Sequence, residues 1–311
     1  MSPRARVFAA YAALVVLGLA APFLVYPVFA MDVLCLALFA SAFNLLLGYA
    51  GLLSFGHAAF LGSAAYVTGY AARSWGLPTE LAILAGVATA TVLGAIFGAL
   101  AIRRSGIYFA MITLGFAQLI YFLVVQLPWT GGEDGLQGIP RGKLLGLVSL
   151  ESNLAMYYFV YAVFLAGFWL LHRTIDSPFG HVLRAIRENE PRAQSLGYDV
   201  DRYKLLAFVI SAALSGLAGS LKALAFQFAS LSDVHWHLSG TVVLMTLLGG
   251  LGTVMGPSVG ALVVVTLENY LSSFGSWVTV ITGAVFVACV LSFRRGIVGE
   301  VRMLVKRSFS A

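Results

Sequence analysis

The sequence predicts an all-α membrane protein: a polytopic helical bundle of eight to ten transmembrane helices with broken or re-entrant elements. Of its 311 residues, 60% are hydrophobic and only 10% are charged, whereas soluble domains carry about 25% charged residues. Its mean hydropathy is +0.92. Apolar runs of about 20 residues, the length that crosses a hydrocarbon core of about 30 Å, recur along the chain. Runs such as 81–102 are continuously apolar, which excludes the alternating pattern of a membrane β-barrel.

We expect one transmembrane domain over residues 1–311, with one long soluble loop at 173–204. The predicted spans are 7–25, 28–48, 56–72, 80–102, 106–127, 154–172, 204–229, 241–271 and 277–293. The first resembles a signal peptide, but Pro22 leads directly into another span, so we interpret it as a helix.

Basic residues cluster at alternate ends of these spans, which indicates orientation because cytoplasmic loops are enriched in Lys and Arg. Arg4 and Arg6 precede the first span, and the loop 173–204 holds six Lys or Arg residues. The tail adds Arg294, Arg295, Arg302, Lys306 and Arg307. Both termini and the loop are therefore predicted to be cytoplasmic. This pattern marks topology and not a phosphate-binding face, so we expect no nucleic-acid partner.

Two of the apolar segments contain helix breakers. Nine simple crossings would place the basic tail outside, so one segment must enter and return. The best candidate is 241–270, which is interrupted by Gly249, Gly250 and Gly252 and then by Gly256 and Pro257. The stretch 48–62 is interrupted in the same way. Paired broken segments in a transporter-like chain indicate a translocation path.

Polar and glycine residues near these breaks are candidate path residues. Unwound backbone at membrane depth lines a cavity or is buried in protein, so either a path or close packing explains them. Glu268 and Lys222 lie well inside apolar spans and could pair with each other. The candidate path residues are Asn44, Gly51, Ser54, Gly56, His57, Thr113, Gly249, Gly250, Gly252 and Glu268.

The loop 173–204 contains the signals of two short helices. Ser177 followed by Pro178 begins the first, and an apolar stripe over 182–186 continues it to about Glu188. Asn189 caps a second helix that Gly197 ends as a left-handed residue. We call this pair the cytoplasmic knob (residues 177–197). It is either an ordinary solvated loop or a rigid docking element that can transmit a push into the helices on either side.

Enzyme signatures are absent from the sequence. The run 51–56 lacks nucleophile-elbow spacing, and the run 131–135 lacks the Gly-Lys-Ser/Thr ending of a phosphate-binding loop. His235, His237 and Asp233 are better explained by an interfacial turn around Trp236 than by a metal site. We therefore predict no catalytic residue, no metal and no cofactor.

Several ordered motifs resemble the branched-chain amino acid permeases of the LivM type. They span roughly residues 44–268 and comprise Gly48–Phe60, Gly106–Leu114, Thr130–Leu136, Arg187–Ala193 with Gly197, and Gly249–Thr253 with Gly256 and Pro257. The family's Glu-Ala-Ala coupling motif is matched only in part: Pro191 stands where the Glu would be, and Glu190 precedes it.

The resemblance implies a subunit of an ABC importer in a bacterial inner membrane that transports branched-chain amino acids and does not itself hydrolyse ATP. Its implied partners are a LivH-like second permease, two cytoplasmic ATP-binding subunits and a periplasmic substrate-binding protein, besides membrane lipid. The residues implied in ATPase coupling are Arg187, Asn189, Glu190, Arg192, Ala193 and Gly197. Two alternatives stay open: the same machine with urea, short amides or other amino acids as cargo, and an ion-driven secondary transporter.

Overall fold

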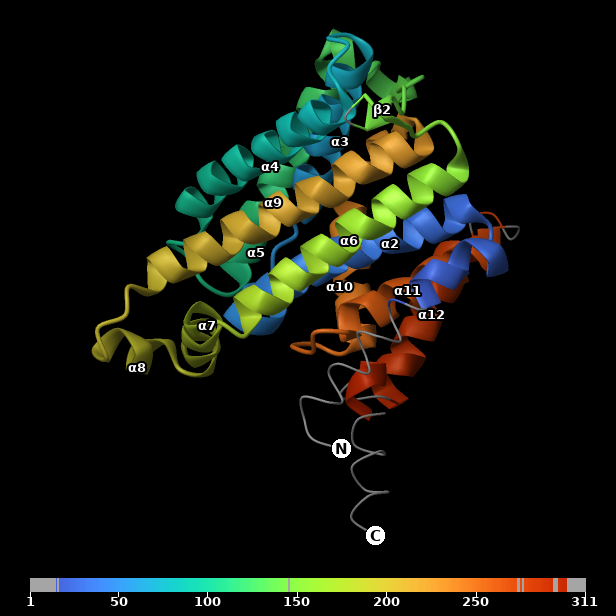
Figure 1. The fold of residues 1–311 in the computed structure, drawn as a ribbon. Coiled ribbons are helices and arrows are strands. Elements are labelled where there is room, and N and C mark those ends of the chain that lie inside the picture. Colours follow the sequence, from blue (N-terminus) through green and yellow to red (C-terminus); the bar gives the residue numbers. More distant parts are fainter. Residues whose placement is uncertain are drawn as a thin grey trace.

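The computed structural model describes residues 15, 17–144, 146–272, 275, 277–292 and 296–300, and it confirms the all-α bundle (Figure 1). Within these residues five helical segments are long and apolar enough to cross a membrane. They are α2 (Pro27–Asn44) with its π-helical continuation η1 (Leu45–Ala50), α4 (Thr79–Ala101), α5 (Ile107–Gln126), α6 (Asn153–Ile175) and α9 (Val200–Phe226). The first half of the first predicted span, with Arg4 and Arg6, and the basic tail lie outside the described residues.

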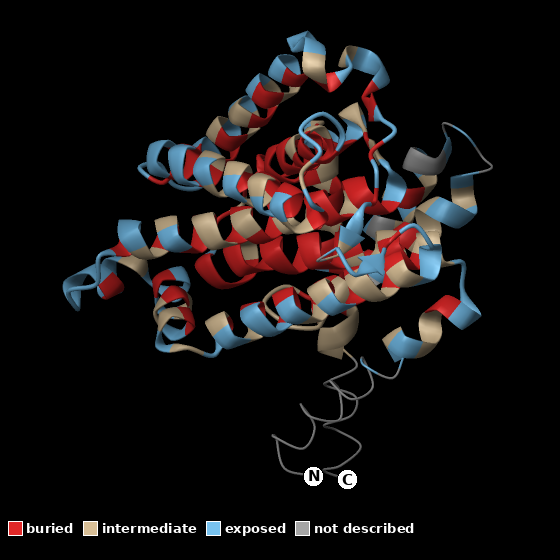
Figure 2. Ribbon diagram, turned by 45° about the horizontal axis from the view of Figure 1, so that its top comes forward, coloured by how far each residue is buried: buried red, intermediate tan, exposed pale blue. Residues whose placement is uncertain are grey.

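Helix α2 occupies the centre of the bundle. It packs against α6 and α9, and also against α10 (Trp236–Gly249) and α11 (Gly256–Leu271). From Cys35 to Asn44 all its residues are buried, as expected for a helix that is apolar all round. Helices α3 (His57–Arg73), α4 and α9 form a second closely packed group. Buried positions accordingly form a band through the middle of the bundle, with exposed positions on the outer helices (Figure 2).

The cytoplasmic knob forms the two predicted helices, α7 (Pro178–Glu188) and α8 (Glu190–Ser195), between α6 and α9 at one end of the bundle (Figure 1). The Ser177 hydroxyl accepts a hydrogen bond from the Gly180 amide at 3.4 Å. The Asn189 side chain accepts one from the Arg192 amide at 3.0 Å. Gly197 has a φ of 89°. The three predicted cap and stop signals are therefore confirmed.

The opposite end holds short elements that the sequence did not predict. The turns η2 (Pro128–Thr130) and η3 (Gly132–Asp134) lead into β1 (Leu136–Gln137), which pairs antiparallel with β4 (Phe228–Ala229). A second pair joins β2 (Lys143–Leu144) to β3 (Val148–Ser149). Arg141 holds this loop against α6 and α9, because its guanidinium donates to the Asn153 side chain of α6 and the Ala225 carbonyl of α9, both at 2.7 Å. Burial lowers the pKa of this guanidinium.

The predicted break in the segment 241–270 is confirmed. Helices α10 and α11 have 14 and 16 residues, about 21 and 24 Å at 1.5 Å per residue. Gly250 and Gly252 between them have φ values of 124° and 72°. Gly249 lies against Gly256, and Gly260 lies against Met245, which is the pairing of two antiparallel helices. The segment thus enters and returns as two short helices. The C-terminal helix α12 (Trp277–Ser292) packs against both.

We predict that Gly260→Ala destabilises the α10–α11 pair. A Cβ at this position would overlap the Met245 carbonyl oxygen, which belongs to backbone and cannot move aside. Overpacking of this kind costs about 1–3 kcal/mol, so the apparent melting temperature of the purified protein in detergent should fall by several degrees. Gly240→Ala in α10 is the matched control, since no atom lies within 4 Å of a Cβ there. Equal melting of the two variants would contradict this packing.

Candidate coupling site and translocation path

The first break is a non-helical segment, residues 51–56, in which side-chain hydroxyls accept hydrogen bonds from backbone amides. It follows η1, a π-helix, a form often found at functional sites. The Thr113 hydroxyl of α5 accepts from the Phe55 amide at 3.1 Å, and the Ser54 hydroxyl accepts from the Gly56 amide at 3.2 Å. The Ser239 hydroxyl of α10 accepts from the Ala58 amide at 2.9 Å. Three candidate path residues, Ser54, Gly56 and Thr113, therefore come together at this break.

Asn44 connects the first break to the second. Its side-chain amide donates to the Thr253 carbonyl at 2.9 Å and accepts from the Gly252 amide at 3.0 Å. Gly48 lies so close that a Cβ there would overlap the Asn44 amide and come within 2.8 Å of the Gly252 nitrogen. Two interrupted segments more than 200 residues apart in sequence are therefore in direct contact. Neither contact could form if Asn44 were apolar.

Helix α7 contacts both breaks through one arginine. The Arg187 guanidinium donates to the Gly48 carbonyl of η1. Its side chain also covers Gly51 and Gly252, where a Cβ would come within 3.1 and 3.4 Å of it. One turn earlier, the Arg184 guanidinium lies 5.1 Å from the centroid of the Tyr49 ring, a cation–π distance. The knob is thus mechanically connected to the point where the two breaks meet.

The remaining candidate coupling residues have different positions. The Glu190 carboxylate forms an ion pair with Lys204 of α9 at 2.6 Å. Ala193 is buried beside Ile186 and Val200. These two residues hold the knob together. Arg192 and Gly197 are exposed, next to Leu196, whose surface is 70% exposed. Arg192, Leu196 and Gly197 therefore belong to the exposed face of the knob.

His57 is the first residue of α3, directly after the first break, and its ring lies in an aromatic part of the core. Its Nε2 is 2.8 Å from the Ser211 hydroxyl, which itself donates to the Ala42 carbonyl at 2.6 Å. The Ser211 oxygen therefore accepts from the imidazole. Three phenylalanine rings surround the imidazole edge-on: Phe43, Phe60 and Phe208. These contacts join α2, α3 and α9, so His57 packs the core and lies away from the Asn44 contact.

Glu268 lies far from the knob, and it is not the ion-pair partner of Lys222. The Lys222 ammonium pairs with the Asp233 carboxylate at 2.7 Å. Asp233 closes a capping box with Ser230 in the turn η4 (Leu231–Asp233) after α9, and this turn brings its carboxylate back over α9. Glu268 lines a cavity of about 400 Å³ beside this pair.

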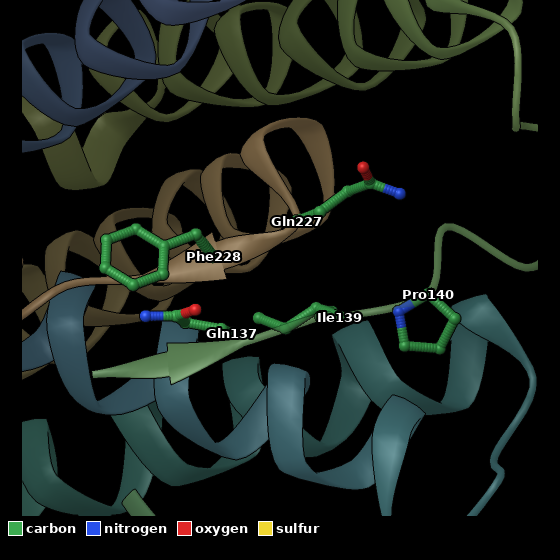
Figure 3. Close-up of a pocket in the computed structure, with 6 residues that line it drawn as sticks. Gln137, Ile139, Pro140, Gln227 and Phe228 are labelled. Atoms are coloured by element: carbon green, nitrogen blue, oxygen red, sulfur yellow. The ribbon is translucent and has the colours of Figure 1, made fainter. Parts of the chain in front are cut away.

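A second hollow, of about 530 Å³, lies between β1 and β4. Figure 3 shows Gln137 and Phe228 on the two strands, with Ile139 and Pro140 on the following loop. Uncharged residues line it, and Gln227 in its wall has a φ of 56°. It belongs to the loops at the end of the bundle opposite the knob and includes no candidate path residue.

The sequence analysis missed three of the connecting residues. Elements distant in sequence are joined by Arg184, Ser239 and Ser41. The Ser41 hydroxyl lies 3.3 Å from that of Ser258. The spacing of three residues between Arg184 and Arg187 was a usable signal, because residues at i and i+3 share a helix face. A serine in an apolar helix gives no comparable signal.

We predict that Asn44→Ala loosens the contact between the breaks. Losing two hydrogen bonds, each worth about 1 kcal/mol, should raise the amide exchange rate over residues 250–256 by about tenfold or more. Hydrogen–deuterium exchange with mass spectrometry measures this directly. Ser63→Ala is the control, since the Ser63 hydroxyl bonds only the Phe60 carbonyl of its own helix. Unchanged exchange in Asn44→Ala would show that the breaks are held by other contacts.

We also predict that Glu190→Ala destabilises the knob by leaving Lys204 unpaired, since the Lys204 side chain is only 5% exposed. Breaking a buried pair costs about 3–5 kcal/mol. The Glu190 side chain is 38% exposed, so solvent screening reduces the expected loss to about 1 kcal/mol. The midpoint temperature of thermal unfolding should be lower for Glu190→Ala, and it should recover in part when Lys204→Met is added. No recovery would mean that the ion pair does not stabilise the knob.

Comparison with known proteins places this geometry in a family. Residues 25–290 match the family described as branched-chain amino acid transport system / permease component. The high-affinity branched-chain amino acid transport system permease protein LivM of Salmonella typhimurium is 27% identical over 287 residues, covering 85% of this chain and 67% of the relative.

Two other relatives match shorter regions. The autoinducer 2 import system permease protein LsrC of Klebsiella pneumoniae is 32% identical over 161 residues, 48% of this chain and 44% of the relative. The probable branched-chain amino acid transport permease protein LivH of Methanocaldococcus jannaschii is 29% identical over 173 residues, which cover 53% of this chain and 54% of the relative. No solved structure matches the chain significantly. Since the family match includes both breaks and the knob, the chain belongs to the LivM-type permeases of ABC importers.

Proposed function

We propose that this chain is a transmembrane subunit of an importer that carries branched-chain amino acids across the bacterial inner membrane. The family match and the LivM relative support this cargo. Two cytoplasmic ATP-binding subunits hydrolyse ATP and dock on the knob, and a periplasmic binding protein delivers the cargo. A LivH-like permease completes the path, since a LivH protein is among the relatives. Both termini and the knob face the cytoplasm.

The contact of Arg187 with both breaks is the observation on which this proposal depends. A docking partner that shifts α7 must move the Arg187 guanidinium relative to the Gly48 carbonyl and to Gly252. A hydrogen bond to a charged group contributes about 1.5–3 kcal/mol, a fraction of what ATP binding supplies. Knob movement can therefore open or close the junction of the two breaks. The exposed Arg192, Leu196 and Gly197 form the surface that the ATPase contacts.

The proposed path follows the contact between α2 and the α10–α11 pair. Ser41 and Ser258 face each other with their hydroxyl oxygens 3.3 Å apart, and Asn44 lies one turn further along α2. Gly51, Gly249 and Gly252 allow close contacts at the inner end, where a Cβ would meet neighbouring atoms. With Asn44 bonded to Thr253 and Arg187 over Gly252, the inner end is closed. Weak mixed contacts along such a path let the cargo leave.

We predict that Arg187→Glu uncouples ATP hydrolysis from uptake. The substituted carboxylate would face the Gly48 carbonyl, which is also an acceptor, so the link from knob to breaks is lost. In proteoliposomes holding the assembled complex and binding protein, leucine uptake per ATP hydrolysed should fall at least tenfold while the protein still inserts. Arg104→Glu is the control, since Arg104 is exposed in the turn between α4 and α5. An unchanged ratio in Arg187→Glu would refute the coupling role.

The same liposomes distinguish the rival cargoes and energy sources. Leucine, isoleucine and valine should compete with one another, whereas ribose and urea should not. Competition by ribose or urea would assign another cargo. The autoinducer 2 permease among the relatives shows that related permeases are described with other cargoes. Accumulation without ATP, driven by an imposed ion gradient, would instead identify a secondary transporter.

A further inference from the structure

A cavity of about 400 Å³ lies at the end of the bundle opposite the knob, between α2, α9, α10 and α11. Its volume falls within the range of sites for small organic ligands, about 300–1,000 Å³. Part of its lining is ionisable: Lys222, Asp233 and Glu268, together with the imidazoles of His235 and His237. Another part is apolar: Leu36, Leu238 and Met245. A ligand that fits must therefore have a charged end and a short apolar end.

The ionisable part of the lining has more carboxyl groups than cations. Asp233 is paired with Lys222 at 2.7 Å, while Glu268 lines the cavity and interacts electrostatically with Lys222 and Asp32 without forming an ion pair among the described residues. Asp32, one turn before Leu36 on α2, also interacts electrostatically with Lys222, and its Oδ1 is buried without a hydrogen-bond partner. Three carboxyl groups thus surround one ammonium. A second ammonium, supplied by a ligand, would balance this arrangement.

Lys222 remains able to hold a ligand carboxylate. A lysine ammonium has three donors, and the hydrogen bond to Asp233 uses one of them. A matching ligand has an ammonium beside Glu268 and a carboxylate beside Lys222. Its short hydrocarbon chain lies against Leu36 and Met245, and one chemical class combines these three groups. That class is the aliphatic α-amino acids.

The cavity also lies in line with the proposed path. Leu36 in its wall precedes Ser41 by five residues and Asn44 by eight on one helix, about 7.5 and 12 Å at 1.5 Å per residue. The closed junction of the breaks therefore lies below the cavity, and the Ser41–Ser258 contact lies between them. A solute in the cavity is separated from the knob end by that contact and that junction.

We infer that this cavity is the outer binding site for the amino acid, with Glu268 binding the α-ammonium and Lys222 the α-carboxylate. The inference rests on the proposed function and deepens it by assigning the cargo a place in this chain.

The test measures binding to the full-length chain alone in lipid nanodiscs, by saturation-transfer difference NMR, without any ATPase. The probes are L-leucine, 3-methylbutylamine, which lacks the carboxylate, and 4-methylpentanoate, which lacks the ammonium. We expect leucine to bind most tightly, the amine to bind detectably, and 4-methylpentanoate to bind at least tenfold more weakly than leucine. Equal binding of leucine and 4-methylpentanoate, or no binding of leucine, overturns the inference.

Variants then assign the ammonium contact. Glu268→Gln should weaken both leucine and the amine at least tenfold, whereas Glu268→Asp should keep most of the binding. Retained binding in Glu268→Asp also excludes a general folding defect at this position. Glu133→Gln, which removes an exposed carboxylate of the loop before α6, should leave binding unchanged. Full leucine binding in Glu268→Gln overturns the assignment.

Uptake by the assembled complex separates this inference from the proposed function. If both hold, Glu268→Gln raises the KM for leucine without abolishing uptake at saturation. If the wild-type complex accumulates leucine and Glu268→Gln leaves its KM unchanged, the cavity assignment fails and the function stands. If the chain binds leucine as expected but the wild-type complex does not transport it, the function fails and the site stands.

Discussion

The structure depends on one constraint: backbone amides and carbonyls at membrane depth must find partners within the protein, because hydrocarbon offers none. Two interruptions, at 51–56 and 250–255, release such groups from helical bonding. Side chains from other helices replace the lost partners, with Thr113 and Ser239 serving the first break and Asn44 serving the second. The surrounding helices are therefore positioned as much by these few polar groups as by apolar packing.

This constraint also determines how the breaks can move. A released amide in hydrocarbon costs several kcal/mol, so the junction of the breaks cannot open gradually. In the proposed transport cycle it exchanges one full set of partners for another. Arg187, on the knob outside the bundle, belongs to the present set of hydrogen-bond partners, because its guanidinium donates to the Gly48 carbonyl. An element in contact with α7 can thus bias the equilibrium without entering the membrane.

The sequence predicted what local chemistry determines. Glycine and proline marked both breaks, and Ser177, Asn189 and Gly197 marked the ends of the knob helices, because caps and left-handed residues act within a few positions. It could not predict which residues meet. Asn44 bonds to a loop over 200 positions away, and the partner of Lys222 is Asp233, because η4 turns that carboxylate back over α9. Two-residue strands such as β1 have no periodic pattern to detect.

The two ends of the proposed path carry opposite charge, and this asymmetry suits a zwitterion. At the outer end carboxyl groups exceed cations around Lys222, so an ammonium is held there. At the inner end Arg184 and Arg187 gather beside η1, so a carboxylate is favoured there. At the outer end the inferred site has a partner for each group of an amino acid, Glu268 and Lys222, whereas the inner end offers only arginines. Conduction requires binding strong enough to admit a solute and weak enough to release it. An outer site that holds both groups and an inner end that holds only the carboxylate would meet that requirement, because the solute loses one of its contacts as it moves inward.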